Sequence, residues 1–224
     1  MTEENQSNST ESLKEYIESI GGTVATIDTV RSDEGEVSDI LVCFHGDHRY
    51  ALVEAPNHPY YEIRYEFSLT EHIATALSQD AISERTGLDP EEIDEIRKVD
   101  RNLLDSDEGE IVIAQNGEDL PPSFLVAQDI IESLDEDVLE RFGLNLFQEL
   151  SQPEVAASLT RTDNGYFDGF RIKRKIFPDD SGFSLTELNN SIQSVITVGT
   201  FGNNWIAQLI GSELEEEFEQ FDMG

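Results

Sequence analysis

The chain has 224 residues, of which 48 are acidic and 14 are basic, so its formal net charge is −34. Leu, Ile, Val and Phe together make up 28% of the residues, above the roughly 20% below which a highly charged chain stays disordered. A chain of this length and composition is expected to fold around its own hydrophobic core, which excludes the fully disordered class.

Only four of the basic residues are lysines, a balance typical of the cytosolic proteins of halophiles. At about 1 M salt the Debye length is about 3 Å, which screens the self-repulsion of such an acidic protein. We therefore expect a halophilic protein, whose net charge says little about its partner. The alternative is a mesophilic acidic protein that binds basic partners.

Cysteine content and hydropathy restrict the compartment. Cys43 is the single cysteine, so an intrachain disulfide is excluded and a reducing environment is indicated. No apolar run approaches the roughly 18 residues of a membrane span. The start of the chain lacks the basic and then apolar regions of a signal peptide. We expect a cytoplasmic protein without a membrane partner.

The first third of the chain predicts one helix followed by a sheet. Residues 1–9 are polar and are predicted to be disordered. Apolar residues at helical spacing predict a helix that ends at Gly21-Gly22. Alternating segments then predict a four-stranded antiparallel meander over 23–31, 37–45, 49–55 and 61–67. Together, residues 10–67 form a predicted helix-plus-sheet region.

The segment 37–45 is apolar on both faces, as in a central strand covered on both sides. Its alternation sends Ile40, Val42 and Phe44 one way and Leu41 and Cys43 the other. We take Leu41 and Cys43 to be the apolar outer face of the meander, and therefore a candidate dimer or client-binding surface.

Residues 68–134 are predicted to be a helical insertion with a loop. A capping box at 68–71 opens the first helix, a second helix ends at Gly87, and a third begins at Asp89-Pro90. Residues 111–114 are a candidate strand, and Pro121-Pro122 indicates a loop.

Residues 135–212 are predicted to complete the domain with a helix, a hairpin and more helix. The helix covers 135–150, and its apolar side is predicted to consist of Val138, Leu139, Phe142, Leu146 and Leu150. The hairpin has strands at 155–162 and 166–177 and turns at Asp163-Asn164-Gly165. A capping box at 184–187 opens the next helix. Gly199 and Gly202 are assigned to a connection before a final helix that contains Trp205, and an acidic tail covers 213–224.

The pentapeptide Phe-Ser-Leu-Thr-Glu occurs at 67–71 and again at 183–187, each time after a strand and at a predicted helix start. An internal duplication is one explanation. The chemistry of helix capping, which selects Ser at the N-cap and Glu three residues later, is the other.

Metal and catalytic motifs give no firm signal. Cys43, His45 and His48 lie within six residues, but their spacing matches no zinc signature, and a buried thiol beside surface histidines is the simpler interpretation. Phosphate-loop, dinucleotide and nucleophile-elbow motifs are absent. We predict a protein that is not an enzyme and has no cofactor; a metal enzyme at Cys43, His45 and His48 is the third hypothesis.

Four of the 14 basic residues fall within one predicted strand, at Arg171, Lys173, Arg174 and Lys175. Alternation places Arg171, Lys173 and Lys175 on one face. This face is a candidate contact for an acidic protein partner, a nucleic-acid backbone or an acidic element of a dimer mate. The alternative is a solvated strand face whose cations form ion pairs with nearby carboxylates.

Residues 70–98 resemble the helix-turn-helix of archaeal winged-helix regulators. The similarity rests on Ile82, Thr86, Gly87 and Leu88 in an Ile-x-x-x-Thr-Gly-Leu pattern. It implies a DNA-binding transcriptional regulator as the alternative function. The recognition helix would carry five carboxylates, which repel phosphates and disfavour a nucleic-acid partner.

The order of elements resembles the type III secretion chaperone-like fold. Residues 166–177, the acidic pair Asp179-Asp180 and residues 183–188 are similar to the strand, turn and helix start of uncharacterised archaeal proteins with that fold. The resemblance implies a dimer that holds protein clients. The resulting prediction is an α+β protein with an antiparallel meander sheet flanked by helices. It acts as an adaptor or chaperone-like homodimer, with Arg171, Lys173, Lys175, Leu41 and Cys43 as candidate binding residues.

Overall fold

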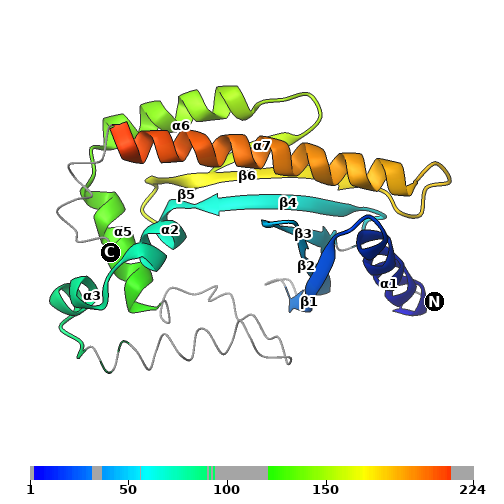
Figure 1. Cartoon of the computed structure of the whole chain (residues 1–224), viewed down its shortest axis with the longest axis horizontal. Helices are drawn as coiled ribbons and strands as arrows, with labels where there is room; N and C mark the ends of the chain where they lie inside the picture. Colours follow the sequence, from blue (N-terminus) through cyan, green and yellow to red (C-terminus); the bar gives the residue numbers. More distant parts are fainter. Residues whose placement is uncertain are drawn as a thin grey trace. The chain divides into compact units, whose positions relative to one another are not determined.

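The computed structural model describes residues 3–31, 37–55, 57–89, 91, 93 and 121–212. These residues form one six-stranded antiparallel sheet, in the order β1-β2-β3-β4-β6-β5, and six helices (Figure 1). The predicted α+β class and antiparallel sheet are confirmed. The strands are β1 (Thr23–Arg31), β2 (Val37–His45), β3 (His48–Glu54), β4 (Tyr61–Ser68), β5 (Ala156–Arg161) and β6 (Phe167–Ile176). The helices are α1 (Glu3–Ser19), α2 (Leu69–Ala76), α3 (Gln79–Thr86), α5 (Pro122–Ser133), α6 (Glu136–Leu150) and α7 (Leu185–Ser212).

The chain forms two compact units. The first contains residues 1–66, 151–157 and 171–200, and the second contains 67–150, 158–170 and 201–224. Strands β4, β5 and β6 and helix α7 each contribute residues to both units.

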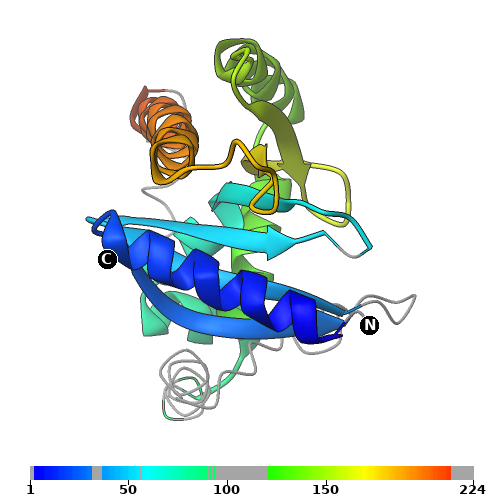
Figure 2. The same ribbon diagram turned by 90° about the vertical axis from the view of Figure 1, so that its right-hand side faces the viewer.

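The first unit buries one face of its strands under α1 and the first part of α7. Figure 2 shows α1 lying across the strands of this unit. Leu13 and Ile17 of α1 are completely buried, as is Ile63 of β4. The α7 residues Leu188, Ile192 and Val195 are also 0% exposed. Burial of these side chains is the main source of stability, at about 25 cal/mol for each Å² of apolar surface.

The expected facing of β2 is wrong. Leu41 and Cys43 are both 0% exposed and lie opposite Leu52 and Tyr50 of β3, which are buried as well. Phe44, on the other face, is 37% exposed. The alternation itself is as predicted. Because β2 is apolar on both faces, its sequence does not show which face α1 covers.

The second unit packs around aromatic side chains. Phe142 of α6 contacts Phe167 of β6, with ring centroids 5.9 Å apart, and Trp205 of α7 at 6.1 Å. Phe67 stacks on Phe170 at 6.0 Å. Gly143 of α6 leaves room for the Phe167 ring, because a Cβ atom there would lie only 2.9 Å from it.

Helix α7 is continuous from Leu185 to Ser212, so the predicted connection at Gly199 and Gly202 is wrong. Both glycines lie inside the helix, where a Cβ atom would collide with the ring of Tyr65 or of Phe170, respectively. They are needed for close packing rather than for a turn. No described helix meets the length and hydropathy needed to cross a membrane.

Two other boundaries differ from prediction. Helix α1 extends back to Glu3, over residues predicted to be disordered; acidic residues near a helix start favour this extension. Pro122 is the first residue of α5 rather than part of a loop, a position where proline loses no hydrogen bond. The candidate strand at 111–114, most of the third helix after Asp89 and the tail at 213–224 lie outside the described residues.

Candidate functional site

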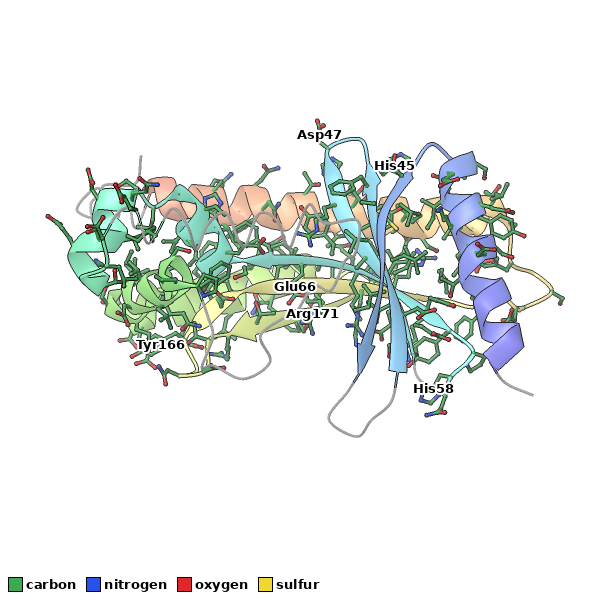
Figure 3. The ribbon with its side chains drawn as sticks, turned by 90° about the horizontal axis from the view of Figure 1, so that it is seen from below. His45, Asp47, His58, Glu66, Tyr166 and Arg171 are labelled. Carbon is green, nitrogen blue, oxygen red and sulfur yellow. The ribbon has the colours of Figure 1, made fainter. Side chains whose placement is uncertain are left out.

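The predicted basic face of β6 forms ion pairs with β4. The Arg171 guanidinium donates to both carboxylate oxygens of Glu66, from Nε at 3.0 Å and from Nη2 at 2.7 Å. Figure 3 shows these two side chains next to each other. Glu62 accepts from Nη2 of Arg64 at 2.7 Å and from Nζ of Lys173 at 3.4 Å. These contacts match the alternative interpretation of the basic strand, a face whose cations have carboxylate partners in their own sheet.

The pKa values of these groups report the pairing. Glu62 is only 6% exposed, and this burial raises its pKa. The hydrogen bonds and charges of Arg64 and Lys173 lower the pKa by more than burial raises it, so the pKa of Glu62 lies below its usual value. The hydrogen bond to Glu66 raises the pKa of Arg171. A partner that binds Arg171 or Lys173 would therefore compete with carboxylates already in place.

The other two basic residues of β6 also have partners in the first unit. Nζ of Lys175 lies 4.0 Å from the ring centroid of Tyr60, a cation–π contact. Arg174 points to the opposite face of the strand and donates to Oγ of Ser194 at 3.2 Å.

Cys43 has the chemistry of a core thiol. Its Sγ donates to the carbonyl oxygen of Leu41 at 3.5 Å, and burial raises its pKa to about 12. Metal ligands and nucleophiles need the thiolate, which this environment disfavours. Residues His45 and His48 pair across the turn between β2 and β3. Within the described residues, no three or more His, Cys, Asp and Glu side chains form a group able to hold a metal ion.

The helix-turn-helix segment begins as predicted. Oγ of Ser68 accepts from the amide of Glu71 at the start of α2, and Oγ of Ser78 accepts from the amide of Ala81 in α3. Gly87 ends α3 in the left-handed conformation, with φ at +72°. The helix that would read DNA lies mostly outside the described residues.

A different candidate site lies along one edge of the sheet in the second unit. Strand β5 is the last strand of the sheet: it pairs with β6 on one side, and no other described strand pairs with its second side. A Cβ atom at Gly143 would lie 3.4 Å from Cδ1 of Leu159, so α6 packs closely over β5. The guanidinium of Arg161, the last residue of β5, binds the Glu140 carboxylate of α6 and so anchors this end of the strand to the helix.

Two large apolar side chains are exposed on the flank of α6 beside this strand. Leu144 is 55% exposed and Phe147 is 39% exposed. They follow Glu140 at the fourth and seventh positions, so the three share one stripe of the helix. Because Glu140 binds Arg161 of β5, this stripe lies on the side of α6 that faces β5, the last described strand of the sheet. We call Glu140, Leu144 and Phe147 together with residues 158–161 the α6–β5 edge.

Acidic side chains surround one end of the α6–β5 edge. Nδ2 of Asn164, in the turn after β5, donates to Glu132 at 2.5 Å. This bond brings the turn residue Asp163 close to the end of α5. Exposed Glu136 and Asp137 begin α6 one turn before Glu140. We call Glu132, Glu136, Asp137 and Asp163 the acidic rim.

This edge was not among the sequence-predicted sites. The buried face of the helix was predicted from Val138, Leu139, Phe142, Leu146 and Leu150, and Leu144 and Phe147 fall outside that set. The signal available in the sequence was that Leu144 and Phe147 are apolar but lie outside the buried stripe of the helix. Their position beside an open strand edge depends on the sheet order, which the pattern did not reveal.

Comparisons with known proteins give one distant match. No protein-family model and no curated protein matches the chain. Among solved structures, the chain is similar to an uncharacterized protein from Methanothermobacter thermautotrophicus, with 15% sequence identity and a TM-score of 0.45. The match covers 89% of this chain and 96% of that chain. This distant neighbour is thus an uncharacterised archaeal protein.

Proposed function

We propose that the chain is a non-enzymatic protein-interaction module, an adaptor or chaperone-like protein that binds its partner through the α6–β5 edge. The observation that supports this most directly is the exposure of Leu144 and Phe147, one helical turn apart, beside a strand edge with no described partner strand. Adjacent exposed apolar side chains and an unpaired edge are each features that a binding partner covers.

The edge lacks the usual protection against strand pairing. Natural edge strands often carry charged residues or proline, which oppose pairing with another chain. Strand β5 has no proline, and its one charged residue is Arg161, which Glu140 neutralises. A strand edge with neither these charges nor a partner strand among the described residues favours a binding role.

This proposal replaces the binding residues predicted from the sequence with the α6–β5 edge. Leu41 and Cys43 are completely buried, and Arg171 and Lys173 are paired with β4 carboxylates. A type III secretion chaperone-like fold, a homodimer and a halophilic host stay predictions that accompany the proposal.

The DNA-binding alternative gains no support from the described part of residues 70–98. The side chains exposed there include Glu71, Asp80, Glu84 and Glu91 against one cation, Arg85. Such a surface repels a phosphate backbone. Recovery of DNA in the experiment below would nevertheless favour this alternative.

Affinity purification from the native cytosol, at the salt concentration of that cytosol, tests the proposal. The tagged wild-type chain is compared with the double variant Leu144→Ser/Phe147→Ser. The matched control is Leu125→Ser/Phe201→Ser, which removes two other apolar side chains of the second unit that are 46% and 42% exposed. Mass spectrometry and nucleic-acid staining identify what is retained.

We expect wild type and control to retain the same stoichiometric protein partner and the α6 double variant to lose most of it. Equal retention by all three chains would show that the α6–β5 edge is not the binding surface. Retention of DNA without a protein partner would show that the regulator alternative is correct.

A further inference from the structure

We infer that the partner supplies an extended, basic segment that pairs with β5 as an additional strand of the sheet. The inference rests on the proposed function and adds the chemistry of the partner. The backbone of β5, the apolar flank of α6 and the acidic rim each specify one property of that segment.

The backbone of β5 specifies an extended conformation. An edge strand presents a row of N–H and C=O groups to its open side, and a second strand satisfies them at a spacing of about 4.8 Å. The side chains along β5 are small at its start, with Ala156, Ala157 and Ser158. An added strand therefore meets little steric obstruction there. Strand addition of this kind is a common mode of peptide recognition.

The flank of α6 specifies apolar residues at alternate positions. Alternate side chains of a strand point to opposite faces of the sheet, and Leu159 and Arg161 of β5 point toward α6. The side chains of an added strand on that same face would lie beside Leu144 and Phe147. Apolar residues at those positions would remove both exposed side chains from water.

The acidic rim specifies basic residues. Four carboxylates from Glu132, Glu136, Asp137 and Asp163 lie around the end of the edge, and Arg161 is already bound by Glu140. Lys or Arg in the segment would lie close to these carboxylates, and charge complementarity would also raise the association rate.

Charge also decides between a foreign partner and a second copy of this chain. In two copies paired through β5 the added strand would be β5 itself, whose one charged residue, Arg161, is already bound by Glu140. A second copy would therefore bring no free cation to the acidic rim, and would lack the charge complementarity of a basic segment. The occupant that the edge favours is therefore a basic segment of another protein.

The test uses fluorescein-labelled synthetic peptides of nine residues with alternating Lys and Val, measured by fluorescence anisotropy against the full chain. The matched peptide replaces every Lys by Glu. Two further peptides carry N-methyl groups, one on each Val and the other on each Lys, because alternate amides of a strand point to opposite edges. Leu144→Ser/Phe147→Ser is the test variant, and Leu125→Ser/Phe201→Ser is its control.

We expect the Lys–Val peptide to bind, and the Glu–Val peptide to bind at least about tenfold more weakly. One of the two N-methylated peptides should lose about tenfold or more in affinity while the other stays close to the parent. The α6 double variant should weaken binding about tenfold, and its control should not. Hydrogen exchange should slow in residues 156–161 on binding and stay unchanged in β1, the opposite edge of the sheet.

Equal loss with both N-methylated peptides, or equal binding of the Lys and Glu peptides, would overturn the inference. So would a stable dimer in light scattering that the α6 double variant abolishes, since a second copy would then occupy the edge. These failures are distinct from failure of the proposed function. If affinity purification shows a partner that depends on Leu144 and Phe147 while the peptides fail, the interaction module stands and strand addition is excluded.

Discussion

Asp168 of β6 holds the first turn of α2 through Thr70. Its Oδ1 atom accepts hydrogen bonds from the Thr70 amide at 2.8 Å and from the Thr70 hydroxyl at 2.5 Å. Thr70 is 5% exposed, so neither donor has free access to water. Ser68 satisfies the amide of Glu71, and the two residues together cap the helix. The carboxylate charge also lies at the positive end of the helix dipole.

Asp168→Ala should lower the free energy of unfolding by about 1–3 kcal/mol, because it leaves two buried donors without an acceptor. Urea denaturation at high KCl measures this change. The control is Asp129→Ala, which removes an exposed carboxylate from α5 and should change stability by about 0.5 kcal/mol or less. Equal effects of the two substitutions would contradict the capping role.

The two glycines inside α7 should be intolerant of alanine. At an exposed helix position, Gly→Ala stabilises by up to about 1 kcal/mol. At Gly199 and Gly202 the added methyl group would collide with the rings of Tyr65 and Phe170, and we expect each substitution to destabilise by about 1–3 kcal/mol. Thermal unfolding measures both. Gly182→Ala is the control, because a Cβ atom there meets no atom within 4 Å; a loss of stability equal to that of the α7 variants would contradict the packing explanation.

The same glycines show where sequence pattern stops being informative. Alternation identified all six described strands within about one residue of their ends, and both capping boxes begin helices as predicted. A glycine pair, however, signals a break and a close helix–ring contact equally well. Pro121-Pro122 was similarly ambiguous, since proline favours both a loop and the first position of a helix.

The candidate site was less predictable than the fold for a related reason. Period-two spacing correctly grouped Leu41 with Cys43, and Arg171 with Lys173, but it does not specify what covers each face. Helix α1 lies on the face of the first pair, since Thr10 of α1 donates to Asp39 on that face of β2. The carboxylates of β4 pair with the second. The residues of α1 and β4 that cover or pair with these side chains lie at least 20 positions away in the sequence. The α6–β5 edge likewise depends on β5 being the last strand of the sheet.

Glu62 should make stability depend on pH in the acid range. Its pKa is lower in the folded protein than the ordinary value of 4.5 that applies in the unfolded chain. The folded state therefore favours the carboxylate, and this stabilisation is complete above pH 4.5 and is lost as the pH falls through the lowered pKa. Glu62→Gln should cost on the order of 1–2 kcal/mol at pH 7, and its difference from wild type should shrink below pH 4.5.

Glu66→Gln is the matched comparison for Glu62. Its side chain is 46% exposed and pairs with Arg171, whereas the Glu62 side chain is 8% exposed. An exposed ion pair contributes about 0–1 kcal/mol, so Glu66→Gln should have the smaller effect at pH 7. Urea unfolding at a series of pH values separates the two. A larger effect of Glu66→Gln would show that the buried carboxylate of Glu62 does not contribute more to stability than the exposed carboxylate of Glu66.

Cys43 should be unreactive until the protein unfolds. The thiol is 0% exposed, and burial raises its pKa to about 12, so almost no thiolate exists at pH 8. A disulfide reagent such as DTNB should therefore modify the native chain no faster than it unfolds, and should react at once in guanidinium chloride. The control is the double variant Cys43→Ala/Ser181→Cys, which moves the thiol to an exposed position and should react quickly in the native state. Rapid modification of native wild-type protein would show that the β2–β3 core opens readily, and would restore Cys43 as a candidate for metal or redox chemistry.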